Sequence, residues 1–381
     1  MIDINSLSKE WLAEKRKQYV KDPAIMESMI YALYLLEQLK LTGLDFIFKG
    51  GTSLILILQK PQRFSVDIDI ILNPKTTNAE LEKYLSTIIG TSVFTNIRLD
   101  ERRSYKDGVP KAHYIFTFQS NVPAKSKDGI VLSNPDREIL LDVLFAENHY
   151  PVLVERPLKT EWLQSVGETI TVKTPDINSI TGDKLTAFAP ETTGVPYFRE
   201  SLNGKGENIK AEMFMEIMKH IFDIGCLFDL IDNMGTCKKS YKATALAEIK
   251  YRSERKISSV EDVLRDTIAA SMIIARKDVQ IDEVGREKFN YLSKGINQFG
   301  HFVYTGKFRI EEAQIASSKA AYLAAIFLSK NKNEFRKFSD KIPLAEYMIT
   351  HPEYNFLNRR LKFIGRGEAL FYWNEIIKLL Y

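Results

Sequence analysis

The sequence is poor in the residues that cross-link small folds or gather around metals. Only two of its 381 residues are cysteines, Cys226 and Cys237, and their spacing does not make a C-x-x-C pair. The five histidines are scattered, and no two of them are four residues apart. The sequence therefore supports neither a disulfide framework nor a cysteine-built zinc site, and it argues against a histidine metal site.

Long apolar runs are also absent. The longest aliphatic stretch, residues 54–58, is far shorter than the ~20 residues that a membrane helix requires. The N-terminus has no basic segment followed by an apolar core, which a secretion signal would need. We therefore expect a cytoplasmic protein without a membrane span.

A large net charge is lacking as well. The 53 basic and 49 acidic residues leave +4, which is too small over this length to show by itself that the protein binds a polyanion. Two local clusters are basic. One surrounds a predicted hairpin and consists of Arg98, Arg102, Arg103, Lys106 and Lys111. The other consists of Lys330, Lys332, Arg336, Lys337, Arg359, Arg360, Lys362 and Arg366. A solvated face and an RNA-guiding surface are both open interpretations.

The patterning predicts an α/β (α+β) chain of two domains, because the length exceeds one typical domain and the composition is globular. Residues 1–175 are expected to form a mixed sheet with flanking helices. Predicted strands there are residues 66–72, 93–99, 112–118 and 138–144. Residues 176–381 are expected to be helical, with predicted helices at residues 212–231, 241–254, 260–276, 311–328 and 369–380. Residues 192–208 are rich in glycine and predicted to form a mobile loop.

The most informative segment begins at Arg63 and runs into the strand predicted at residues 66–72. Alternate side chains of a strand share one face, so one face of this strand is polar and the other is apolar. The polar face carries Arg63, Ser65, Asp67 and Asp69. Two carboxylates about 7 Å apart repel each other, and a cation between them is the simplest way to keep both ionised. Mg²⁺ suits this pair because it prefers carboxylate and phosphate oxygens.

A glycine turn precedes this strand. Gly50 and Gly51 allow close approach of a ligand to the backbone, and a helix that begins near Thr52 offers N–H groups that favour a phosphate. Ser53 adds a hydroxyl donor. The turn and the acidic strand together predict a site for a triphosphate and its metal ions. Either motif alone could instead be a plain strand–helix turn or a solvated strand end.

The run Gly-Gly-Thr-Ser-Leu from Gly50, followed by Arg-x-Ser-x-Asp-Ile-Asp from Arg63, resembles the AbiEii/AbiGii family of nucleotidyltransferase toxins. That family is related to the mycobacterial MenT toxins within the polymerase β-like nucleotidyltransferase superfamily. The resemblance implies a catalytic domain followed by a helical domain that contributes to the active-site cleft.

The resemblance also implies three further site residues. A third carboxylate on a neighbouring strand would be Asp142, a lone acid in an apolar run, although an edge-strand acid facing water is the alternative. Lys184, at an expected helix start, would contact the nucleotide phosphates. Asp223 would be a later helical acid, although an ion pair with Lys219 competes with that role. The family often has an Arg-Asp pair before this acid, whereas Lys219 and His220 precede it here.

The expected activity is a metal-dependent transfer of a nucleotide from a nucleoside triphosphate (NTP) to an RNA acceptor. Two Mg²⁺ ions would bind Asp67, Asp69 and Asp142, and pyrophosphate would be released. By resemblance the acceptor is the 3′ end of tRNA, and the protein is the toxin of a toxin–antitoxin or phage-defence pair with a cognate antitoxin. A nucleotidyltransferase for a small-molecule hydroxyl and an inactive nucleotide-binding interaction protein are the alternatives.

Overall fold

The computed structural model describes residues 1–58, 60, 62–105, 109–124, 131, 133–202, 207–257, 259–279, 281–329 and 335–381. The chain forms two compact units. The first comprises residues 1–176 and 302–306, and the second comprises residues 177–301 and 307–381. The return of residues 302–306 to the first unit was not indicated by the sequence pattern. Lys106, Lys330 and Lys332 of the basic clusters lie outside the described residues.

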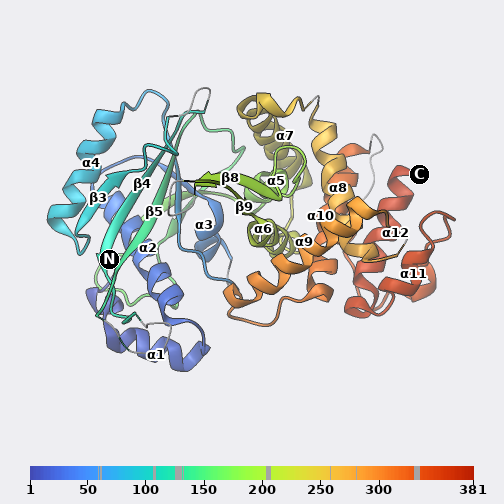
Figure 1. The fold of residues 1–381 in the computed structure, drawn as a ribbon, viewed down its shortest axis with the longest axis horizontal. Coiled ribbons are helices and arrows are strands. Elements are labelled where there is room, and N and C mark those ends of the chain that lie inside the picture. The colour runs from blue at the N-terminus through green and yellow to red at the C-terminus, as the bar shows by residue number, and fades with distance from the viewer. Residues whose placement is uncertain are drawn as a thin grey trace. The chain divides into compact units, whose positions relative to one another are not determined.

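The first unit is built on a mixed sheet of seven strands, in the order β3-β4-β5-β2-β1-β7-β6 (Figure 1). The β2–β5 and β1–β7 neighbours are parallel, and the other neighbours are antiparallel. The strands are β1 (Ile47–Lys49), β2 (Ile68–Leu72), β3 (Asn96–Leu99), β4 (Lys111–Gln119), β5 (Asp136–Phe145), β6 (Leu153–Pro157) and β7 (Thr171–Pro175). This arrangement confirms the predicted fold class.

One face of the sheet is buried under helix α2 (Pro23–Leu41), which packs against β5. The predicted start of this helix is confirmed: Asp22 accepts a hydrogen bond from the backbone of Ala24, and Pro23 occupies the first turn. On the buried face, the ring of Tyr31 stacks on Phe118 with centroids 3.8 Å apart. The other helices of this unit are η1 (Ile4–Leu7), α1 (Lys9–Tyr19), α3 (Gly50–Ile57) and α4 (Asn78–Thr91).

The second unit is mainly helical. Its long helices bury small residues where they cross, as at Gly182, where an added β-carbon would lie 2.6 Å from the backbone nitrogen of Tyr241. The helices are α5 (Ile177–Ala187), α6 (Phe214–Phe228), α7 (Met234–Tyr251), η2 (Ser253–Arg255), α8 (Val260–Arg276), α9 (Glu283–Phe299), η3 (Gly300–Phe302), α10 (Ile310–Leu328), η4 (Leu344–Tyr347), α11 (Phe356–Leu361), η5 (Ile364–Gly367) and α12 (Glu368–Leu380). Among the described residues, no helix combines the length and the apolar character that crossing a membrane demands.

Some local predictions are wrong. The acidic strand begins at Ile68 rather than at residue 66, because the preceding residues are held by other contacts, such as the hydrogen bond from the Phe64 N–H to the carbonyl of Phe302. The predicted mobile loop, residues 192–208, contains strand β8 (Phe198–Leu202) and the start of β9 (Asn208–Glu212), which pair as a hairpin. Residues 203–206 of that loop lie outside the described residues.

Candidate active site

The glycine turn lies against one of the predicted acids. Strand β1 ends at Lys49, and α3 begins directly at Gly50, whose φ of +77° is a conformation that favours glycine. A β-carbon added to Gly50 would lie 2.6 Å from Cγ of Asp69, inside any permitted contact distance. The Asp69 carboxyl group therefore packs directly on the backbone of the turn. Lys49, the N-cap residue of α3, makes no capping hydrogen bond through its side chain.

Two of the acids form one row with two basic residues across the sheet. Lys49 is paired with Asp69, Asp69 with Asp142, and Asp142 with His113, on the successive strands β1, β2, β5 and β4. Directly paired residues of neighbouring strands project from the same face, so all four side chains are on one face. The flanking residues Ile68 and Ile70 are fully buried on the opposite face. Within β2, Asp69 thus lies on the polar face and Ile68 and Ile70 lie on the apolar face. The prediction that Arg63, Ser65 and Asp67 belong to the same strand is wrong, because all three precede β2.

Asp67 lies immediately before β2 and is exposed. Its backbone carbonyl accepts a hydrogen bond from the hydroxyl of Thr52, whose oxygen also lies 2.9 Å from Oγ of Ser65. Thr52 is fully buried in α3. The first turn of this helix therefore ties the Asp67 backbone to the glycine turn, and Asp67, Asp69 and the turn are brought together.

Arg63 and Ser53 support the turn. The Arg63 side chain is 7% exposed, packs against Gly51 and donates a hydrogen bond from Nη1 to the carbonyl of Phe64 at 2.9 Å. The hydroxyl of Ser53 is buried and donates to the carbonyl of Gly50 at 2.9 Å. These contacts stabilise the turn from beneath. Binding of a nucleotide by Arg63 and Ser53, and by Thr52 and Ser65, stays a prediction.

Asp142 has two basic neighbours that the sequence reasoning missed. Its Oδ1 is hydrogen-bonded to Nδ1 of His113, and its Oδ2 is 3.8 Å from Nη2 of Arg103. Strand β5 lies between β4 and β2, which excludes the alternative of an edge-strand acid. A signal for His113 was available, since this residue interrupts the apolar run of β4 as Asp142 interrupts that of β5.

Lys184 and Asp223 form a buried ion pair within the second unit. Nζ of Lys184 is 2.8 Å from Oδ2 of Asp223, and the side chains are 5% and 1% exposed. Lys184 occupies the last turn of α5, so its predicted place at a helix start is wrong. The helix begins earlier, at Ile177, directly after β7. The competing partner of Asp223, Lys219, has an ion pair with Glu216 at 3.9 Å.

A comparison with protein families agrees with this geometry. The model for the nucleotidyl transferase AbiEii toxin of the type IV toxin–antitoxin system matches residues 34–301, more than half of the chain. The chain belongs to the AbiEii family. The matched range contains Asp67, Asp69, Asp142, Lys184 and Asp223, and the match confirms the resemblance indicated by the motifs. The comparison with curated proteins finds no match.

Membership in the AbiEii family assigns the protein to a nucleotidyltransferase family of a type IV toxin–antitoxin system and implies an antitoxin partner. In the described part of the chain, no group of three or more His, Cys, Asp or Glu side chains is gathered tightly enough to hold a metal ion by itself. Asp69 and Asp142 nevertheless fit Mg²⁺, because their strands are roughly 4.8 Å apart and Mg²⁺ takes few protein carboxylates together with phosphates and water.

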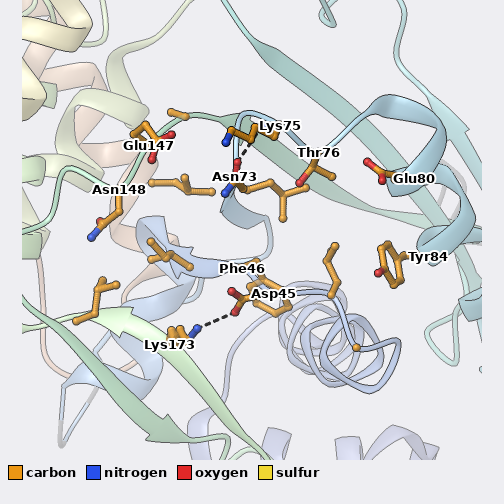
Figure 2. Close-up of a pocket in the computed structure, with 17 residues that line it drawn as sticks. Asp45, Phe46, Asn73, Lys75, Thr76, Glu80, Tyr84, Glu147, Asn148 and Lys173 are labelled. Carbon is orange, nitrogen blue, oxygen red and sulfur yellow. Dashed lines mark hydrogen bonds and ion pairs between the residues drawn. The ribbon is translucent and has the colours of Figure 1, made fainter.

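A separate pocket in the first unit of this AbiEii-family chain contains none of the predicted site residues (Figure 2). It has a volume of about 640 Å³ and lies at the carboxyl ends of β2 and β5. Its charges are of both signs: Asp45 pairs with Lys173 at 2.8 Å, and the carboxylates of Glu80 and Glu147 share the rim with Lys75. A pocket with charges of both signs does not favour the highly negative triphosphate. We therefore place the candidate active site at the glycine turn.

Proposed function

We propose that the protein transfers a nucleotide from an NTP to an RNA hydroxyl, with the 3′ end of tRNA as the acceptor. The observation that carries the proposal is the register pairing of Asp69 with Asp142, together with the packing of Asp69 on Gly50. It unites an acidic pair and a glycine turn in one compact unit of a chain from a nucleotidyltransferase family.

In this proposal the turn binds the β- and γ-phosphates. The glycines at positions 50 and 51 allow close approach, and the N–H groups in the first turn of α3 favour anions. A role for Lys184 in neutralising the leaving pyrophosphate stays a prediction from the family resemblance. Asp67, Asp69 and Asp142 would hold Mg²⁺, which when bound neutralises triphosphate charge and fixes its geometry.

The proposed reaction is an in-line substitution at the α-phosphate. Asp142 orients the acceptor hydroxyl and accepts its proton, while the acceptor oxygen forms a bond to the α-phosphorus. The bond between that phosphorus and the oxygen of the β-phosphate breaks, and pyrophosphate leaves with the electron pair. Asp67 and Asp69 keep the α-phosphate aligned for attack.

The proposed consequence is growth arrest. A tRNA with an extra nucleotide on its 3′ end cannot be aminoacylated there, so translation would stop until the antitoxin relieves the effect. This outcome suits a toxin–antitoxin pair that defends against phage and acts in the cytoplasm, where NTPs and tRNA are present.

The test is incubation of the purified protein with Mg²⁺, total RNA and each of the four α-labelled NTPs in turn. The expected result is label at the 3′ end of tRNA with one preferred NTP, and no label when Mg²⁺ is removed by a chelator. Absence of label on RNA with all four NTPs would contradict the proposal.

The identity of the acceptor has a specific alternative, a small molecule in place of RNA. Arg98 and Arg103 of the first basic cluster are paired with Glu138 and Asp142 at 3.0 Å and 3.8 Å, which reduces the charge available to an RNA backbone. A small-molecule acceptor would be indicated if the same assay labels a hydroxyl compound in a cell extract and leaves RNA unlabelled.

A further inference from the structure

We propose that His113 is a positioning residue, which fixes the Asp142 carboxylate in the orientation that nucleotide transfer needs. The inference rests on the proposed function, because it assigns His113 a role through Asp142. Neither the motifs nor the family comparison points to His113; its place beside Asp142 on the polar face of the sheet does.

The contact with His113 gives the two oxygens of the Asp142 carboxylate different roles. An ionised carboxylate only accepts hydrogen bonds, so Nδ1 of His113 carries the hydrogen and donates it to Oδ1. Oδ2 lies 3.8 Å from Nη2 of Arg103, beyond hydrogen-bond distance. Oδ2 is therefore the oxygen that a bound cation or an acceptor hydroxyl would contact in place of the long ion pair with Arg103, and the imidazole keeps the carboxylate from rotating Oδ2 away.

His113 is itself held in place from several sides. Its side chain is 11% exposed, and its neighbours Ala112 and Tyr114 are buried. Its backbone N–H donates to Oγ of Ser104 at 2.9 Å, and that hydroxyl donates to the carbonyl of Asp100 at 2.7 Å. The turn that carries Arg103 is thus fastened to β4 at the position of the imidazole. Because the His113 side chain has so little conformational freedom, it can hold the Asp142 carboxylate in one orientation.

This arrangement matches the chemistry of other carboxylates that bind cations. Such ligands are usually hydrogen-bonded by a second group, and loss of that group typically costs about 10–100-fold in metal affinity or activity. A purely structural histidine would affect the melting temperature instead. The two roles therefore predict different measurements.

The experiment compares His113→Phe, which keeps a ring and removes the donor, with His113→Asn, whose amide places a donor near the position of Nδ1. Mn²⁺ binding to the protein alone, followed by electron paramagnetic resonance, is the first readout, and kcat and KM for the NTP are the second. We expect His113→Phe to weaken Mn²⁺ binding and lower kcat by about 10–100-fold with little change in KM. His113→Asn should recover most of both losses. The control, His301→Phe in η3 at an exposed position, should match the wild type.

Two results would overturn the proposal: wild-type Mn²⁺ affinity in His113→Phe, or equal impairment of His113→Phe and His113→Asn. In an Asp142→Asn background His113→Phe should have no further effect, since interacting residues are not additive. If His113→Phe does not fold, His113→Gln, whose donor is one bond farther from the backbone, replaces it with the same expected losses. Failure of the wild type to transfer any nucleotide would reject the proposed function, while the Mn²⁺ comparison would still decide the role of His113.

Discussion

At the scale of single residues, Gly50 is a position where the structure leaves no room for a side chain. We expect Gly50→Ala to abolish nucleotide transfer almost completely, because the new methyl group would occupy the space of the Asp69 carboxyl group and alanine is strained at a φ of +77°. The measurement is the rate of label incorporation beside the melting temperature. The strain should cost about 1–2 kcal/mol of stability, too little to unfold a typical protein of this size.

Gly90 supplies the matched control. It lies in α4, and a β-carbon there would meet no atom within 4 Å. Gly90→Ala should therefore leave transfer unchanged and stabilise the protein by up to about 1 kcal/mol through helix propensity. Wild-type activity in Gly50→Ala would show that the turn does not position Asp69.

The buried carboxyl group of Asp266, in α8, should make the stability of the protein depend on pH. Burial raises the pKa of this carboxyl group to about 6, although hydrogen bonds from the backbone of Glu191 and from Thr192 oppose the shift. Because the folded pKa lies above the unfolded one, this group contributes most to stability below about pH 4 and loses that contribution as the pH rises through about 6.

Asp266→Asn tests this dependence, since an amide keeps an acceptor oxygen and cannot ionise. Between pH 4 and 7 the wild type should lose up to about 3 kcal/mol of unfolding free energy relative to the variant. Urea unfolding of both proteins across this range gives the difference, in which the other titrating groups cancel. A difference that stays constant with pH would contradict the assigned pKa.

At the scale of elements, the sequence predicted which residues share one face of a strand better than it predicted which strands pair. The alternation of Ile68, Asp69 and Ile70 was enough to separate a polar from an apolar face, because the period of a strand is a local property. The pairing of Asp69 with Asp142 brings together residues 73 positions apart. Register of this kind depends on packing between distant segments, so Asp142 was found through resemblance and His113 was not found at all.

The helices show the same limit. The predicted span of residues 260–276 coincides with α8, whose start is marked by the cap of Ser259 on the Asp262 N–H. Strands β8 and β9 were missed, because their pattern is polar and their partner lies across a glycine-rich connection. The position of Lys184 in the last turn of α5 was also missed, because the helix begins at Ile177, directly after Asp176 and earlier than expected.

The ion pair that joins α5 to α6 gives a prediction for these elements. Lys184→Met should lower stability by about 3–5 kcal/mol, because it leaves the Asp223 carboxylate buried without its cation. If Lys184 also neutralises the triphosphate, transfer should fall far more than the loss of folded protein explains. Activity per folded molecule, measured well below the melting temperature, is the relevant quantity.

Lys319 is the matched control for that substitution. It is equally buried and pairs with Asp229 and Glu368 at 2.8 Å and 2.9 Å within the same unit. Because Asp229 and Glu368 are 57% and 21% exposed, Lys319→Met should destabilise the protein less than Lys184→Met, and it should leave activity per folded molecule unchanged. Equal activity of the two variants per folded molecule would reduce Lys184 to a structural residue.

At the scale of the whole molecule, the chain joins a mixed-sheet unit to a helical unit, and the predicted site residues are divided between them. Asp67, Asp69 and Asp142 belong to the first unit, whereas Lys184 and Asp223 belong to the second. Family membership covers parts of both units. The central claim is that Asp67, Asp69 and Asp142, beside the glycine turn, carry out nucleotide transfer. It therefore concerns the first unit most directly.

The measurement that tests this claim is a comparison of Asp69→Asn and Asp67→Asn with the wild type, in melting temperature and in transfer of labelled nucleotide to tRNA with Mg²⁺. Both variants should melt at or slightly above the wild-type temperature without metal, because two nearby carboxylates resist joint ionisation. Both should lose transfer, because each removes an acidic ligand and its charge together. Variants that melt normally and label tRNA at the wild-type rate would contradict the account.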